Sequence, residues 1–311
     1  MKKVVVIGGG HGQAAVLRGL KDIDSIELTT IVTVADDGGS TGKLRRDFQI
    51  PAMGDIRGVM LALAESETLL STLMNYRFDE NSETMGGHNL GNIILTALTQ
   101  STGSFMDAIT MISKVLNVKG NIVPSSTQVI TLYAVMEDGT IVRGESNIPK
   151  LRNHIQKVFY REPVKATDAA IDAICNADYI VYGAGSLYTS ILPNIIIDGI
   201  RSAIQQSKAK KIYFCNPMTQ SGETEFYTVE DHVKAIESHV QDKIDKVFVA
   251  SDIIPNDVLK AYLNENSTRV PLSIVEHEYE VELCSLLSFD NRLVRHDAQK
   301  VKEAFLKELG E

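Results

Sequence analysis

Cysteine is scarce in this chain of 311 residues, which contains only Cys175, Cys215 and Cys284. Three cysteines that lie far apart exclude a disulfide framework and a Cys-x-x-Cys metal or redox motif, so we expect buried thiols. Long apolar runs are lacking too. The first run ends in glycines after Ile7 and is too short for a secretory signal, and no other stretch approaches the ~18 residues of a membrane span. These absences predict a cytoplasmic protein.

Clusters of basic residues are also missing. The formal net charge is −9, and the longest basic clusters are the pairs Arg45–Arg46 and Lys210–Lys211. Binding to a nucleic-acid backbone needs clustered lysine and arginine, so this charge argues against a nucleic-acid partner. The remaining composition, 44% hydrophobic and 23% charged, is that of a globular protein with a sizeable core.

Two common catalytic motifs are absent from the sequence. It contains no Gly-Lys-Ser/Thr phosphate loop and no His-Glu-x-x-His zinc motif. His232 and His239 stand seven residues apart on a predicted helix, a spacing more compatible with a solvent-exposed face than with a metal site. No segment forms an obvious pair of nucleophile and base, so no catalytic residue is assigned.

What the chain does contain is an alternation of β and α patterns. Residues 2–8 predict a buried strand, 13–21 a helix and 26–35 a second strand, which together form a β-α-β unit. The pattern resumes near residue 177, with further strands at about 178–182, 211–215 and 246–250. Polar or glycine-rich loops follow these strands, as in an open α/β sheet whose ligands bind beyond the carboxyl ends of its strands.

Two regions interrupt this alternation. Residues from about 53 to 119 look mainly helical and predict a helical insertion, whereas residues 128–146 alternate around an Asp-Gly turn and predict an antiparallel hairpin. We find no internal repeat and no low-complexity linker. We therefore predict a single domain over residues 1–311, with no function assigned to residues 251–311.

The most informative segment is the glycine-rich turn Gly8–Gly12, which follows the first strand. Such a turn brings backbone N–H groups to the N-terminus of a helix, where the helix dipole favours a phosphate. It resembles the G-x-G-x-x-G fingerprint but lacks the third glycine at the usual place, and a simple tight turn is the alternative. His11 sits where its side chain can face a ligand, although a lone loop histidine is as often a surface residue.

A second segment places Asp36 and Asp37 before Gly38, Gly39 and Ser40. Adjacent carboxylates point to different sides of an extended chain. One of them could hold a ribose or Mg²⁺ while the other caps the turn, and the glycines would offer backbone donors to phosphate. The alternative is an Asp-Gly turn with a helix N-cap.

Four later segments are further candidates. Pro51–Arg57 and Gly86–Asn92 each combine glycine with polar groups just before a helix and could bind an anion, or Asp55 and Asn89 could simply cap these helices. Gly183–Asn194 is a second strand–glycine–helix junction that we expect near the first, where the two could hold both ends of a diphosphate. The amides in Asn216–Gln220 could read the edge of a base, or the segment could be a polar turn.

Several segments together resemble the CofD-like superfamily: Gly8–Gly10, Val34–Ser40, Gly54–Arg57, Gly87–Asn92 and Gly185–Pro193. The segments Asn216–Gln220, Gly222–Thr224 and Asp231–Val233 narrow the resemblance to the YvcK branch, the gluconeogenesis factors. The resemblance runs in order from Lys2 to about Ala250.

This resemblance implies a Rossmann-like, three-layer α/β/α fold with a mainly parallel sheet. The enzymatic branch of the superfamily transfers a phospholactyl group from a guanosine-diphosphate donor to a deazaflavin, using Mg²⁺. The YvcK branch implies binding of UDP-sugars such as UDP-N-acetylglucosamine and a role in cell shape and wall synthesis on gluconeogenic carbon sources, with no established reaction. His11 replaces the usual threonine, a change that would make binding sensitive to pH.

We therefore predict a regulator that binds a nucleotide sugar, and the resemblance adds a homodimer and cell-wall regulatory proteins as partners. The residues expected to bind nucleotide or phosphate are Gly8, Gly9, Gly10, His11, Gly12, Asp36, Asp37, Gly38, Gly39, Ser40, His88, Asn92, Gly183, Gly185, Ser186, Tyr188, Thr189, Asn216, Met218, Thr219 and Gln220. Asp36 and Asp37 are the candidate Mg²⁺ ligands.

Two other functions compete with this prediction. A Mg²⁺-dependent transferase of the CofD type must leave an open slot beside Asp36 and Asp37 for its acceptor, whereas a regulator needs no such slot. An NAD-dependent redox enzyme is the weaker alternative because the third fingerprint glycine is absent.

Overall fold

The computed structural model describes residues 1–65, 69–289 and 292–311. Its centre is a seven-stranded sheet in the order β10-β9-β8-β7-β1-β2-β3, and neighbouring strands in this sheet pair in parallel. The strands are β1 (Lys2–Gly8), β2 (Ile26–Val32), β3 (Asn121–Pro124), β7 (Tyr179–Gly183), β8 (Lys210–Phe214), β9 (Lys246–Ala250) and β10 (Glu280–Cys284). The predicted parallel α/β fold is confirmed.

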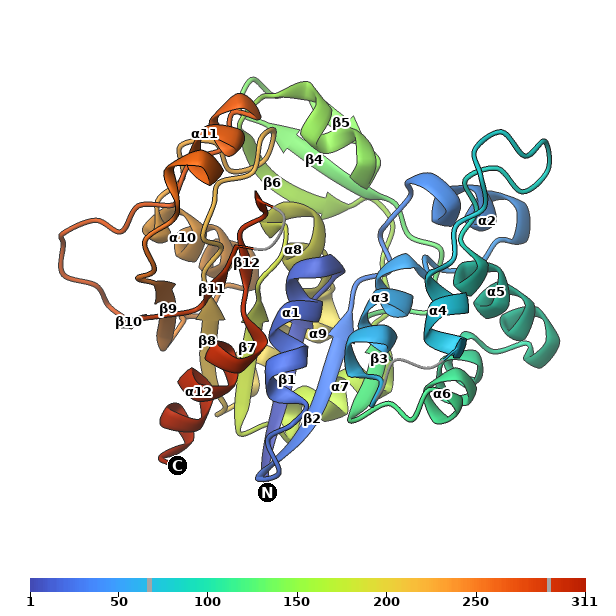
Figure 1. Cartoon of the computed structure of the whole chain (residues 1–311), viewed down its shortest axis with the longest axis horizontal. Helices are drawn as coiled ribbons and strands as arrows, with labels where there is room; N and C mark the ends of the chain where they lie inside the picture. Colours follow the sequence, from blue (N-terminus) through green and yellow to red (C-terminus); the bar gives the residue numbers. More distant parts are fainter. Residues whose placement is uncertain (66–68, 290–291) are drawn as a thin grey trace.

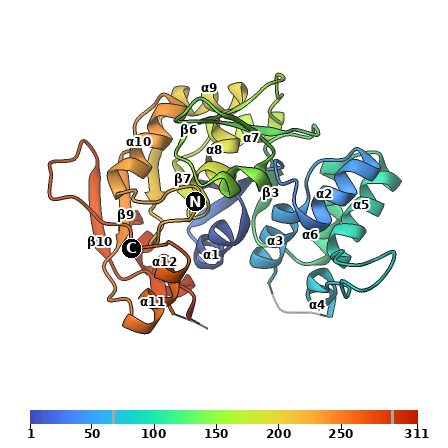
Figure 2. The ribbon, with the colours of Figure 1, turned by 90° about the horizontal axis from the view of Figure 1, so that it is seen from above.

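Helices cover both faces of this sheet, which explains why its inner strands are almost continuously apolar. One face carries α1 (Gly10–Leu20), α3 (Gly54–Leu63) and α12 (Ala298–Leu309), and the other carries α7 (Asp168–Cys175), α9 (Asp198–Gln206) and α10 (Val229–Val240) (Figures 1 and 2). The result is the three-layer arrangement that the resemblance implied.

The region predicted as a helical insertion contains α3 and three further helices. They are α4 (Leu69–Asn75), α5 (Leu90–Thr102) and α6 (Phe105–Val115), and residues 66–68 of the region lie outside the described residues. Together with α2 (Gly39–Phe48), α4–α6 form a group at one end of the molecule (Figure 2). Asn89 caps α5 by accepting a 3.2 Å hydrogen bond from the Asn92 N–H.

A small antiparallel sheet lies above the carboxyl ends of the central strands (Figure 1). Its order is β5-β4-β6, from β4 (Leu132–Met136), β5 (Ile141–Arg143) and β6 (Ile155–Tyr160). The predicted hairpin of β4 and β5 is confirmed, whereas β6 was not predicted. The 3₁₀ helix η1 (Glu145–Leu151) connects β5 to β6.

The C-terminal residues, which received no function from the sequence, complete the central fold. They form α11 (Asn256–Asn264), edge strand β10, the antiparallel pair β11 (Leu287–Ser288) and β12 (Arg295–His296), and α12. The last helix packs closely on α1, because a Cβ atom at Gly19 would lie only 2.6 Å from the carbonyl oxygen of Ala298. This segment therefore belongs to the layer that holds α1.

Two expectations about side-chain burial were wrong. Cys215 is buried, but Cys175 is exposed and Cys284 is partly buried, because the C-terminus of α7 and edge strand β10 lie at the surface. His232 does not face solvent: it is fully buried, and its ring stacks on Tyr213 at 6.4 Å. Within the described ranges, no helix is long and apolar enough to cross a membrane.

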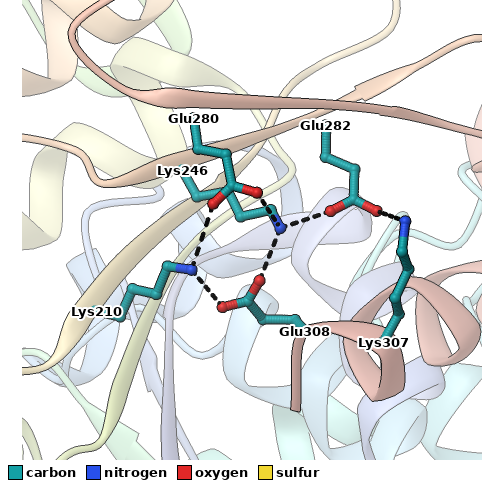
Figure 3. Close-up of polar contacts among 6 residues, drawn as sticks. All are labelled: Lys210, Lys246, Glu280, Glu282, Lys307 and Glu308. Atoms are coloured by element: carbon teal, nitrogen blue, oxygen red, sulfur yellow. Dashed lines mark hydrogen bonds and ion pairs between the residues drawn. The ribbon is translucent and has the colours of Figure 1, made fainter. Parts of the chain in front are cut away.

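A partly buried network of ion pairs ties the first residues of β8, β9 and β10 to the end of α12 (Figure 3). Lys246 lies at its centre, 2.9 Å from Glu280 and 2.8 Å from Glu308, and it also contacts Glu282. The side chains of Lys246 and Glu308 are only 5% and 6% exposed. The three glutamates outweigh the effect of burial and raise the pKa of Lys246.

We predict that Lys246→Met destabilises the protein by about 1–3 kcal/mol, since it removes the central cation from the nearly buried carboxylates of Glu282 and Glu308, which then keep one lysine each. The matched control is Lys307→Met, which removes an exposed partner of Glu282 and should cost less than about 1 kcal/mol. Chemical denaturation of the two variants gives the comparison, and equal losses would contradict this account of the network.

Candidate functional site

The two glycine turns interlock at the carboxyl ends of β1 and β7. A Cβ atom at Gly12 would lie 2.5 Å from the backbone nitrogen of Gly185 and 2.6 Å from the carbonyl carbon of Ala184. Gly10 and Gly185 adopt φ values of 64° and 143°, which side chains disfavour. The structure thus brings the two predicted junctions together between the neighbouring strands β1 and β7. This is the topological switch point of the sheet, because the chain continues from β1 toward one edge and from β7 toward the other.

Asp55 lies directly behind the first glycine turn. A Cβ atom at Gly9 would approach its Oδ2 to 2.5 Å, and the backbone N–H of Gly10 donates a hydrogen bond to its carboxylate. The sequence suggested that Asp55 could cap α3, but Met53 holds the cap position and Asp55 lies in the first turn of the helix. The sequence singled out the segment that contains Asp55 but gave this side chain a capping role, which is wrong.

The neighbouring carboxylates of Asp36 and Asp37 point to different partners, as the sequence predicted. Asp36 accepts a 2.8 Å hydrogen bond from the N–H of Gly38, within its own turn. Asp37 accepts a 2.9 Å hydrogen bond from the N–H of Ser146 at the start of η1. Arg45 is buried and holds this loop by donating to the carbonyl oxygens of Ala35 and Asp36.

Carboxylates accumulate beside these turns. Burial and the charge of Asp36 raise the pKa of Asp55 to about 7. Burial and the charges of Asp36, Asp55, Glu223 and Asp37 raise the pKa of Glu145 to about 8. In the part of the chain that the structure describes, no group of three or more His, Cys, Asp or Glu residues is arranged to hold a metal. A cation bound here would need further ligands, such as phosphate oxygens.

Three arginines act electrostatically on His11, the second residue of α1. Partial burial and the charges of Arg295, Arg57 and Arg18 lower the pKa of His11. Among the described residues, neither Arg18 nor Arg295 forms an ion pair, and burial and the charge of Arg295 lower the pKa of Arg18. Arg295 comes from β12, beyond the part of the chain that carried the family resemblance, so the sequence analysis had no signal for it.

The predicted residues of α2 and α5 also meet. The Oγ of Ser40 accepts a 3.1 Å hydrogen bond from the N–H of Asn89 and lies 3.4 Å from Nδ1 of His88. The side chain of Asn92 donates to Thr41 at 3.3 Å and accepts from Arg57 at 3.0 Å. The Gly38–Gly39 turn is thus fixed against the start of α5.

The segment 216–223 stabilises the second glycine turn through hydrogen bonds to Gly185 and Thr189. The amide of Asn216 donates to the carbonyl oxygen of Gly185 at 2.7 Å and accepts from its N–H at 3.2 Å. Glu223 is buried and accepts hydrogen bonds from the side chains of Thr189 at 2.9 Å and Gln220 at 3.1 Å. These polar groups serve internal contacts in the structure.

The other residues predicted in these two segments are also anchored inside the protein. The hydroxyl of Tyr188 lies 2.7 Å from that of Tyr227. Thr219 accepts a 2.8 Å hydrogen bond at its Oγ1 from the N–H of Thr268. Met218 is buried and forms a β-bridge with Arg269. Base recognition by residues 216–220 stays a prediction.

A parallel sheet between two layers of helices, with glycine turns at the switch point of the sheet, defines a Rossmann-like α/β protein. Residues 4–288 match the family model described as 2-phospho-L-lactate transferase CofD, and the chain belongs to this family. It is 46% identical to a gluconeogenesis factor of Halalkalibacterium halodurans, over 98% of this chain and 96% of that protein. It is 44% identical to the gluconeogenesis factor of Bacillus subtilis, over 96% and 95%.

A solved structure supports the same relationship. The crystal structure of a protein from Bacillus halodurans superposes with a TM-score of 0.93 at 45% sequence identity, covering 98% of this chain and 99% of that one. The predicted resemblance to the YvcK branch, the gluconeogenesis factors, is therefore confirmed.

We predict that Gly12→Ala destabilises the protein by about 1–3 kcal/mol, because the added methyl group must push the two glycine turns apart. Gly58 is the matched control, since it is also helical and a Cβ atom there would meet nothing within 4 Å. Gly58→Ala should be neutral or stabilise by up to about 1 kcal/mol. Urea denaturation distinguishes the variants, and equal effects would contradict the interlocked arrangement.

The carboxylates generate a second prediction, on pH. Asp55 binds its proton more tightly in the folded state than in the unfolded state. Its destabilising effect is therefore absent below about pH 4 and grows as the pH rises to about 7. The free energy of unfolding should fall over this range, with a slope of at most about 1.4 kcal/mol per pH unit from this group. Asp55→Asn should flatten the decline, and an unchanged slope would contradict the assignment.

Proposed function

We propose that this protein binds a nucleotide sugar of the UDP-N-acetylglucosamine type between the carboxyl ends of β1 and β7. We further propose that it acts in the cytoplasm as a regulator of cell shape and wall synthesis during growth on gluconeogenic carbon sources. The observation that carries the binding proposal is the interlocking of Gly12 with Gly185, which presents the N-terminus of α1 at the switch point of the sheet.

The charges around this turn suit a diphosphate. Arg18 and Arg295 lie near His11, and the first turn of α1 adds backbone N–H groups and the positive end of the helix dipole. Since the pKa of His11 is lowered, its imidazole is neutral at neutral pH and still offers one N–H donor. The favourable charge then comes from the arginines and the helix, and His11 supplies a hydrogen bond.

One observation favours a regulator over a transferase. The space beside Asp37 is filled by η1: the N–H of Ser146 donates to Asp37, and a Cβ atom at Gly144 would lie 2.5 Å from its Oδ2. A transferase needs an open slot at this place for its acceptor. The arrangement fits a protein that holds one ligand and reports on it.

A Mg²⁺-dependent transferase is the second candidate function, and the carboxylates favour it. The charge of Asp36 raises the pKa of the buried Asp55, and Mg²⁺ commonly combines one or two carboxylates with substrate phosphates. The matching family model carries the name of a phospholactate transferase. In this reading Asp36 and Asp55 would hold the ion, and Asp37 would keep its contact with η1.

Calorimetric and thermal-shift titrations against UDP-N-acetylglucosamine, UDP-glucose, GDP and NAD, each with and without Mg²⁺, separate these functions. A ligand that binds only the native state raises its apparent stability by mass action. We expect selectivity for the UDP-sugars without dependence on Mg²⁺. Preference for GDP with Mg²⁺ would favour the transferase, and preference for NAD would overturn both proposals.

We predict that Arg295→Ala weakens binding of UDP-N-acetylglucosamine by at least about tenfold, the effect of losing one charged hydrogen bond to phosphate. The control is Lys234→Ala, which removes an exposed cation from α10 and should leave affinity within about twofold, because screening weakens distant surface charges. Equal affinities of the two variants would place the phosphates elsewhere.

A further inference from the structure

We propose that Asp252 is a positioning residue, which holds Arg295 of β12 against α1, on which β12 packs. The inference rests on the proposed function for its consequence in ligand binding. Asp252 follows the carboxyl end of β9, and its side chain is only 8% exposed. It belongs to no motif that the sequence analysis singled out.

Four donors converge on this carboxylate. They are the hydroxyl of Ser285 at 2.6 Å, the N–H of Leu286 at 2.7 Å, the N–H of Leu287 at 3.1 Å and the ammonium group of Lys300 at 2.9 Å. Burial alone would raise the pKa of Asp252, but these hydrogen bonds and the charge of Lys300 lower it to about 2. Asp252 is therefore ionised at neutral pH and binds the start of β11 firmly.

Because β11 pairs with β12, the hydrogen bonds that fix β11 to Asp252 also restrict the position of Arg295. Leu287 pairs with His296, and Ser288 pairs with Arg295. The ammonium group of Lys300 also donates to the carbonyl oxygen of Leu287 at 2.6 Å. Asp252 and Lys300 thus hold β11 from two sides, and β11 determines where β12 places Arg295.

Arg295 needs such a restraint because its surroundings are positive. It lies close enough to Arg18 and His11 to lower the pKa of both. In the absence of an anion, this repulsion favours movement of the exposed Arg295 side chain and its short strand toward solvent. The buried hydrogen bonds at Asp252 oppose that movement and keep the phosphate site organised before a ligand arrives.

The opposite end of α12 offers a matched control. There, Glu282 contacts Lys246 and Lys307 in the network at the start of the strands (Figure 3). Glu282→Gln and Asp252→Asn each remove one partly buried carboxylate charge that holds the C-terminal segment. Of these two carboxylates, only that of Asp252 contacts β11, so only Asp252→Asn should release Arg295.

The first experiment needs no ligand. NMR titration of His11, assigned with His11→Gln, measures its pKa in the wild type, Arg295→Ala, Asp252→Asn, the double variant and Glu282→Gln. Relative to the wild type, we expect the pKa of His11 to rise by similar amounts in Arg295→Ala and Asp252→Asn. The double variant should show the same rise as either single variant, and Glu282→Gln should show none. A pKa that rises in Arg295→Ala but not in Asp252→Asn would overturn the positioning role.

Calorimetry with UDP-N-acetylglucosamine on the same variants tests the consequence for binding. Asp252→Asn should weaken binding about tenfold, the double variant should be no weaker than Arg295→Ala, and Glu282→Gln should bind like the wild type. If additive losses appear in the double variant, Asp252 acts independently of Arg295 and the proposal is wrong. If the wild type itself does not bind, the proposed function fails, while the titration of His11 still decides the positioning role.

Discussion

The close packing of Gly12 on the backbone of Gly185 is the constraint on which the rest of the site depends. It allows the first turn of α1 and the loop after β7 to lie side by side at the switch point of the sheet. Any larger residue would separate them by an amount that close-packed interiors accommodate poorly. Neighbouring side chains stabilise the same contact. Asp55 accepts a hydrogen bond from the N–H of Gly10, and Asn216 bonds to both the N–H and the carbonyl oxygen of Gly185.

Around this contact the charges are separated. The charges of three arginines act on His11 at the start of α1, whereas carboxylates gather near Asp36 and Glu145. A phosphate is favoured on the first side, and a sugar hydroxyl or a cation on the second. The position of η1 against Asp37 fills the place where an acceptor would sit, which is why we favour a binding protein over a transferase.

The sequence predicted much of the fold because its inner strands are buried on both faces and are therefore continuously apolar, as in β1. The sequence could not predict β10, because Glu280 and Glu282 are typical of a solvent-exposed segment. Their partner Lys246 lies on another strand and meets them only in the folded protein. The glycine turns of the site were predictable because glycine is demanded by local geometry. Arg295 and the true partners of Asp37 and Asn216 were not, since they depend on contacts between segments far apart in the chain.

The most direct test of the central claim is a crystal structure of the protein with UDP-N-acetylglucosamine. The account predicts the diphosphate at the first turn of α1, within hydrogen-bond distance of the backbone N–H groups of Gly10–Gly12, with Arg295 beside it. A sugar nucleotide bound away from the junction of β1 and β7, with the two glycine turns untouched, would contradict it.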